Sequence, residues 1–150
     1  MTGEHGSDDP ILDYFNRSPY RTLLDITITA AGDGAAEGRL EFGDKHSSNR
    51  RSRIGQGGVA FSLADSVAGA AATALVGFPT PTIDFRIDYL APATGDLFAT
   101  AEVVREGGET AVVDVEVVDD DGDEIAVGRG VYKTSDLPDD APWDIEQGDK

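Results

Sequence analysis

The sequence predicts an α+β fold in which an antiparallel sheet wraps around one long helix. The first observation is a stretch of about twenty residues from Gly57, rich in Ala, Leu and Val, with one charge, Asp65. A helix that is apolar on nearly all sides should be buried. Four strand patterns follow this stretch and a hairpin pattern precedes it. One apolar helix needs a sheet to cover it, which gives an α+β layer arrangement.

Local patterns justify each element in turn. Acidic residues before Pro10 mark the start of a short helix. Alternating apolar and polar residues are typical of half-buried strands, and glycine-containing turns join two pairs of them into hairpins. Gly77 and Pro79 stop the long helix. In chain order we expect a helix at 11–16, strands at 24–29 and 36–42, a helix from 57 to 77, and strands at 83–89, 97–104, 111–118 and 125–132.

These elements form one domain, residues 11–134. A disordered lead is expected at 1–10 and a loose acidic tail at 135–150. The length of 150 residues fits a single domain, and 39% hydrophobic residues can supply its core. Because a single buried helix makes a thin core, we expect two copies to pair through strand edges or helices.

The charge balance excludes several classes of partner. The chain carries 12 basic against 29 acidic residues, a formal net charge of −17. It therefore lacks the global basic surface that nucleic acids require, and an anionic membrane would repel it. Without cysteine there is no disulfide or thiolate chemistry; no signal peptide or membrane span is visible, which indicates the cytoplasm. The acid excess serves solubility or adaptation to molar salt, and few lysines with many aspartates favour the latter.

Asp65 is the most informative single residue. A buried carboxylate is costly unless it is paired or functional, and its helical neighbours are apolar. It is a candidate catalytic group; alternatively, it lies on a solvent-facing stripe or accepts a hydrogen bond from a strand. A Ser-His-Asp hydrolase is not indicated, because no nucleophile elbow is present, and we expect His46 to be an ordinary surface-loop residue.

Gly57 and Gly58 open the same helix. Its first N–H groups lack intrahelical partners and can polarise a carbonyl oxygen; an ordinary loop-to-helix turn is the structural alternative. Gly58 and Asp65 lie seven residues apart, on nearly the same face but about 10 Å apart along the axis. One small reacting group cannot contact both. Two antiparallel helices across a twofold axis would join Gly58 of one chain to Asp65 of the other.

Three arginines, Arg50, Arg51 and Arg53, lie just before the long helix. In so acidic a chain this concentration suggests a clamp for the phosphates of an anionic ligand. Local charge balance with Asp44 and Glu41 explains it equally well.

In combination these features resemble a known family, the hotdog-fold acyl-CoA thioesterases of the phenylacetate-pathway (PaaI) type. The resemblance covers roughly residues 11–134. It implies a five- or six-stranded antiparallel sheet curled around the helix, and a homodimer, often paired again into a homotetramer, with active sites between subunits. It rests on Asn49 and on the segments 57–65 (GGVAFSLAD), 82–96 (TIDFRIDYLAPATGD), 104–105 and 121–132 (DGDEIAVGRGVY).

The resemblance also implies roles for individual residues. Asp65 falls on the family's general base or nucleophile, and Gly58 on the N–H that polarises the thioester carbonyl. Asn49 falls on the asparagine that helps hold the water or the carbonyl. Gln56 stands where the family usually has histidine; glutamine donates and accepts hydrogen bonds but does not carry a proton at neutral pH.

We therefore expect hydrolysis of an acyl-CoA thioester to a free acid and CoA. Asp65, Gly58, Asn49 and Gln56 would be catalytic, with Gly57 beside the substrate. The acyl chain would lie in an apolar slot between subunits near Phe61, with CoA phosphates on the arginine loop. No metal or redox cofactor is expected. The alternative is a non-catalytic module that binds or senses acyl-CoA.

Overall fold

The computed structural model describes residues 9–135. The lead and tail expected at 1–10 and 135–150 lie almost wholly outside this range, although α1 begins at Pro10, inside the expected lead, with Asp9 as its N-cap. The elements are α1 (Pro10–Asn16), α2 (Pro19–Leu23), β1 (Ile26–Gly32), β2 (Ala35–Leu40), the 3-10 helix η2 (Asp44–His46), α3 (Gly57–Val76), β3 (Thr82–Tyr89), β4 (Leu97–Glu106), β5 (Thr110–Asp119) and β6 (Glu124–Lys133).

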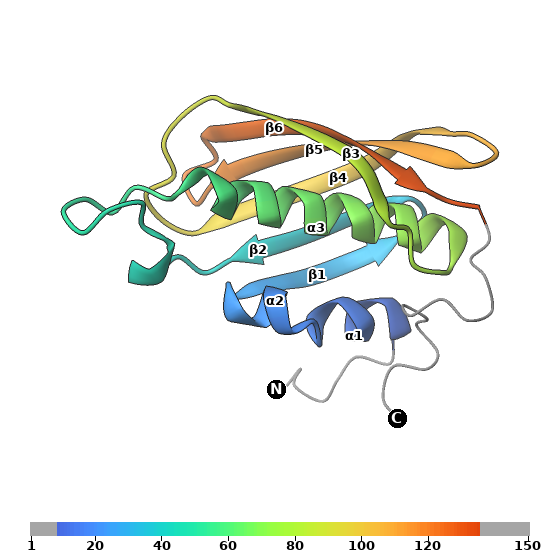
Figure 1. Cartoon of the computed structure of the whole chain (residues 1–150), viewed down its shortest axis with the longest axis horizontal. Coiled ribbons are helices and arrows are strands. Elements are labelled where there is room, and N and C mark those ends of the chain that lie inside the picture. Colours follow the sequence, from blue (N-terminus) through green and yellow to red (C-terminus); the bar gives the residue numbers. More distant parts are fainter. Residues whose placement is uncertain (1–8, 136–150) are drawn as a thin grey trace.

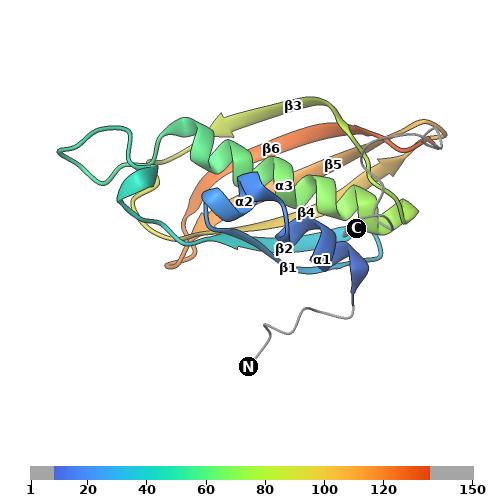
Figure 2. The same ribbon diagram turned by 60° about the horizontal axis from the view of Figure 1, so that its bottom comes forward.

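The α+β architecture is confirmed. Six strands form one antiparallel sheet in the order β1-β2-β4-β5-β6-β3. Figure 1 shows α3 lying along one face of the curved sheet, as expected for the hotdog fold. The short helices α1 and α2 run beside α3 near the β1 edge (Figure 2).

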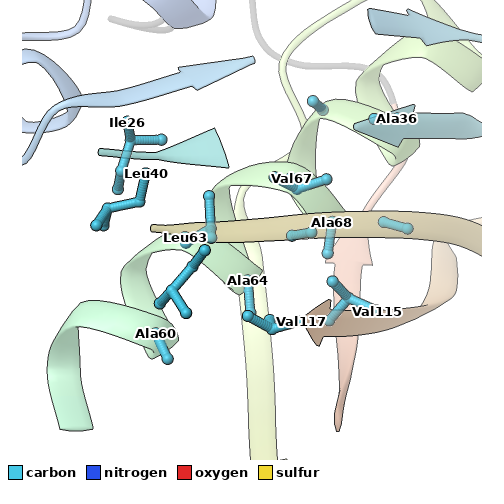
Figure 3. Close-up of a cluster of buried hydrophobic side chains, with 14 of the residues drawn as sticks. Ile26, Ala36, Leu40, Ala60, Leu63, Ala64, Val67, Ala68, Val115 and Val117 are labelled. Atoms are coloured by element: carbon cyan, nitrogen blue, oxygen red, sulfur yellow. The ribbon is translucent and has the colours of Figure 1, made fainter. Parts of the chain in front are cut away.

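The long helix α3 is the core of the molecule. Gln56 caps its start, and Gly77 ends it in the left-handed conformation (φ 87°). Its composition would suit a membrane span, yet 67% of its most apolar window is buried inside the protein, so it is a core helix. The buried side of α3 packs in one cluster with apolar strand residues that include Leu40, Val115 and Val117 (Figure 3). At Gly38 a Cβ atom would lie 2.6 Å from Val67 Cγ2, so glycine lets β2 approach the helix closely.

Two short helices and the bounds of some strands differ from the sequence-based expectation. The strand expected to reach residue 42 ends at Leu40. The first strand begins at Ile26 rather than residue 24, because Ser18 and Pro19 start the additional helix α2, and Asp25 then turns the chain with φ 59°. The turn η2 was also not predicted. It carries His46, discussed below.

The two edge strands of the sheet, β1 and β3, differ in how they are covered. Along β1, the Asn16 side chain donates to Ile28 O and accepts from Ile28 N at 2.9 and 2.8 Å, so it occupies backbone groups of the edge strand. Along β3 the large apolar side chains of Ile83 and Tyr89 are 58% and 52% exposed. Among the described residues, large apolar side chains therefore remain exposed on the edge strand β3.

Candidate active site

Asp65 lies on a polar stripe of α3 that does not face solvent. Other small or polar residues at helical spacing share this side: Ser62, Ser66, Gly69 and Thr73. The N-terminal helices cover the stripe, since Tyr20 Oη lies 2.9 Å from Ser62 Oγ and Arg21 Nε donates to Ser66 Oγ at 3.0 Å. Asp65 is half-buried as a result. The solvent-facing alternative is wrong.

Two strands hold the Asp65 carboxylate by a single oxygen. Oδ1 accepts from Tyr132 Oη at 2.7 Å and from Thr82 Oγ1 at 3.0 Å. These are the helix-to-strand hydrogen bonds that the sequence allowed as an alternative to a catalytic role. Among the described residues Oδ2 accepts no hydrogen bond, so this oxygen is available to a water molecule or a substrate.

Tyr132 is completely buried at the end of β6. Burial, together with the charge of Asp65, raises the pKa of this phenol far above its usual range. The raised pKa favours the protonated phenol, which donates to the carboxylate. Room for its ring comes from Gly130, where a Cβ atom would lie 2.5 Å from the Tyr132 ring and 2.8 Å from Phe85.

At the start of α3 the two glycines have different surroundings. The Gln56 side-chain oxygen accepts from Gly58 N at 2.5 Å, so the N–H expected to bind a carbonyl is occupied by the helix's own cap. Within the described chain Gly57 N–H has no hydrogen-bond acceptor, while Gly57 O accepts from Tyr89 Oη at 2.6 Å. A cavity of about 340 Å³ opens beside this turn, lined by Gln56, Gly57 and Tyr89 among others.

The loop 47–55 extends away from the body of the protein (Figure 1). Asn49 Oδ1 accepts from the backbone N–H groups of Arg51 and Ser52 at 2.8 and 2.9 Å, so it shapes its own loop. In the described residues no hydrogen bond joins Asn49 to the start of α3 or to Asp65.

The three arginines of this loop separate into two kinds. Arg53 pairs with Asp44 at 2.7 Å and stacks on the Phe42 ring, 5.2 Å from its centroid. For this residue local charge balance accounts for the side chain. Arg50 and Arg51 are exposed and form no ion pair within residues 9–135, so they remain candidates for an anion.

The expectation for His46 was wrong. Its side chain is 1% exposed. Nδ1 accepts from Gly43 N at 2.8 Å and Nε2 lies 2.8 Å from Leu24 O, which identifies the neutral Nε2–H form as a structural link between η2 and the N-terminal region. Its backbone oxygen accepts from Gln56 N at 2.9 Å, so His46 also supports the residue that caps α3.

Within one chain, the expected catalytic residues do not come together, and Asn49 stays in its loop. Gln56, Gly57 and Gly58 lie at the start of α3, whereas Asp65 lies two helical turns on. Sequence patterns missed Thr82 and Tyr132, the two hydrogen-bond donors to Asp65. One available signal was the pair of glycines, Gly128 and Gly130, at alternate positions before Tyr132, because glycines in a strand interior often mark close approach of another group.

Several known proteins resemble this chain over most of its length. The family model described as "Thioesterase superfamily" matches residues 57–126. A protein of Halobacterium salinarum named "Putative esterase" is 32% identical over 146 residues, which cover 89% of this chain and 97% of the relative. A solved structure described as a thioesterase-superfamily protein is 30% identical, with a TM-score of 0.77 and coverage of 83% and 95%. The PaaI protein from the phenylacetic acid degradation operon of E. coli is 25% identical, with a TM-score of 0.74 and coverage of 81% and 88%.

Proposed function

The chain belongs to the thioesterase superfamily, and from this premise we propose that it hydrolyses an acyl-CoA thioester to a free acid and CoA. The observation that carries the proposal is the Asp65 carboxylate. Tyr132 and Thr82 fix its Oδ1, and its Oδ2 has no hydrogen-bond donor among the described residues. A carboxylate held in this way can take a proton from water as a general base, or attack the thioester carbon directly.

The carbonyl oxygen needs a hydrogen-bond donor, and the start of α3 offers two. Gly57 N–H is open, and Gly58 N–H becomes available if the Gln56 side chain rotates away. Both lie near the positive end of the helix dipole. The freed Gln56 amide would then contact the thioester in place of the histidine usual in this family.

One chain cannot bring these donors to its own Asp65, since seven helical residues span about 10 Å. We propose a homodimer in which each site combines the helix start of one chain with Asp65 of the other. The apolar β3 edge, with Ile83 and Tyr89 exposed, supports this pairing. Phe61 packs edge-on against Phe85, 5.0 Å between ring centroids, and would extend the apolar surface beside the thioester. A dimer of such dimers remains our proposal for the full assembly.

CoA would lie along the partner's helix start. The cavity of about 340 Å³ beside Gly57 suits the slender pantetheine arm, and Arg50 and Arg51 supply guanidinium groups for the phosphates. Arg53, paired with Asp44, contributes less in this proposal, and Asn49 acts only if its loop rearranges. We further propose a cytoplasmic location, on the sequence grounds given above.

A panel of acyl-CoA thioesters assayed in molar salt tests the proposal. We expect Asp65→Asn to abolish hydrolysis, because the amide accepts protons far more weakly than the carboxylate. Asp114→Asn is the matched control. Asp114 also holds an arginine with its carboxylate, but on the outer face of the sheet, so this variant should keep full activity. Full activity in Asp65→Asn would refute the mechanism.

One observation favours a second function, non-catalytic binding of acyl-CoA. Gln56 occupies Gly58 N–H, so the donor can remain closed to the carbonyl. Tight binding of CoA esters by calorimetry, with no release of free CoA over hours, would select this alternative.

A further inference from the structure

A second cavity lies directly behind Asp65, beneath the N-terminal helices. It measures about 320 Å³. Asp65, Gly69 and Thr73 of α3 form one wall, and Tyr14 and Arg21 of the N-terminal helices form the opposite wall. The cavity therefore extends from Asp65 along α3 towards Thr73, away from the start of the helix.

The walls of this cavity are mixed: apolar residues such as Phe15 and Pro79 alternate with polar side chains. Thr73 Oγ1 and Thr80 Oγ1 lie 2.9 Å apart, and Thr82 Oγ1 donates to Asp65. Tyr14 also lines the cavity, and burial raises the pKa of this phenol.

Arg21 is the positive charge of the cavity, and it is fixed in place. Its Nε donates to Ser66 Oγ at 3.0 Å, and its guanidinium carbon lies 4.6 Å from the centroid of the Phe15 ring. Burial lowers the pKa of Arg21, partly offset by the charges of Tyr14 and Asp65.

The remaining donors of Arg21 are not used by the protein. A guanidinium has five N–H donors, and only the Nε bond is made within the described chain. No carboxylate within residues 9–135 forms a salt bridge with it. A partly buried cation with open donors at the wall of a cavity suits an anionic group of a ligand.

We propose that this cavity binds the far end of the acyl group and that the preferred substrates carry a terminal carboxylate, held by Arg21. The inference rests on the proposed thioesterase function and specifies its substrate class. Arg21 and Asp65 line the same cavity, and the charge of Asp65 acts on Arg21, so a short dicarboxylic acyl group can place its carboxylate at Arg21 while its thioester carbon lies at Asp65. The guanidinium fork matches a carboxylate with two parallel hydrogen bonds.

Matched pairs of thioesters test the inference, with all measurements at one salt concentration. Succinyl-CoA is compared with 4-methylpentanoyl-CoA, and glutaryl-CoA with 5-methylhexanoyl-CoA. In each pair the carboxylate is replaced by an isopropyl group of similar shape. In at least one pair, we expect kcat/KM to be at least tenfold higher for the thioester that carries the carboxylate than for the one that carries the isopropyl group. Arg21→Gln should reduce that ratio to about one, and Arg21→Lys should keep part of it.

Arg105→Gln is the control, since it removes the same charge from an exposed position on β4, and its ratio should equal that of the wild type. Equal rates within both pairs for the wild type would overturn the inference while leaving the thioesterase function standing. A uniform loss across all substrates in Arg21→Gln would also overturn it, because that result indicates a purely structural arginine. If Arg21→Gln fails to fold, the wild-type and Arg21→Lys ratios decide.

If no thioester is hydrolysed, the proposed function fails, and the cavity is tested by calorimetric titration with free glutarate and with glutaramide, the uncharged diamide of the same length. Binding of glutarate alone, lost in Arg21→Gln, would support the anion site independently of turnover. Absence of glutarate binding would overturn it.

Discussion

Replacing Tyr132 by phenylalanine isolates the hydrogen bond that holds Asp65. The substitution removes one oxygen and keeps the ring in the space that Gly130 leaves open. Two contacts are lost: the donation to Asp65 Oδ1 at 2.7 Å and a longer one to Asp65 O at 3.3 Å. Thr82 then remains the only donor to the carboxylate among the described residues.

The expected size of the effect follows from this geometry. A hydrogen bond to a charged group contributes about 1.5–3 kcal/mol. Asp65 is half-buried and keeps Thr82, so the lower limit of that range applies. If the carboxylate is positioned for the reaction by Tyr132, a loss of about 1.4 kcal/mol in transition-state stabilisation lowers kcat roughly tenfold. KM should change little, because Tyr132 is fully buried and does not reach the substrate.

The assay measures free CoA released from the best substrate of the panel, together with urea denaturation. Tyr20→Phe is the matched control, since Tyr20 also contacts an α3 side chain, Ser62, through its hydroxyl. Its kcat should equal that of the wild type. An unchanged kcat in Tyr132→Phe would refute the positioning role, and an unchanged free energy of unfolding would refute the strength assigned to the hydrogen bond.

Three further results are expected. Gly38→Ala should destabilise the protein by about 1–3 kcal/mol in urea, because its Cβ would overlap Val67; Gly95→Ala, with nothing within 4 Å of its Cβ, should be nearly neutral. Because the pKa of Tyr132 is raised above its unfolded value of 10.0, its stabilising contribution is complete below pH 10 and falls by up to about 1.4 kcal/mol per pH unit above it. Between pH 10 and 11 the free energy of unfolding should therefore fall less steeply with pH in Tyr132→Phe than in the wild type. Equal slopes would contradict this. With a net charge of −17, the thermal midpoint should rise from about 0.1 M to molar salt as repulsion is screened, whereas a neutral osmolyte at equal osmolality should not reproduce the dependence on ionic strength.

The fold was predictable because its main signals are local. The apolar run from Gly57 and the glycine at residue 77 define α3 almost to the residue, and alternation defines the strands. The helix α2 was missed because its signal, Ser18 before Pro19, is followed by only five helical residues. Such a short helix depends on packing against its neighbours rather than on propensity.

The candidate site was only half predictable, for a related reason. Asp65 stands out as a lone charge in an apolar helix, but its partners Thr82 and Tyr132 are 17 and 67 residues away in sequence. Only the fold brings them together. The buried position of His46 likewise depends on two backbone contacts, to Gly43 and Leu24, that no local pattern reveals.

The arginines on the surface and the partly buried Arg21 have different partners. Arg53, Arg86 and Arg129 each pair with an aspartate on the surface, where ion pairs contribute little and serve mainly to balance charge. Arg21 instead contacts an aromatic ring and a serine. Within residues 9–135 it forms no salt bridge, although the charge of Asp65 acts on it. The cost of its partial burial is only partly offset by Asp65. A ligand that supplies a further anion offsets this cost on binding. The same arrangement therefore lowers the stability of the unliganded protein and favours binding of a negatively charged acyl group.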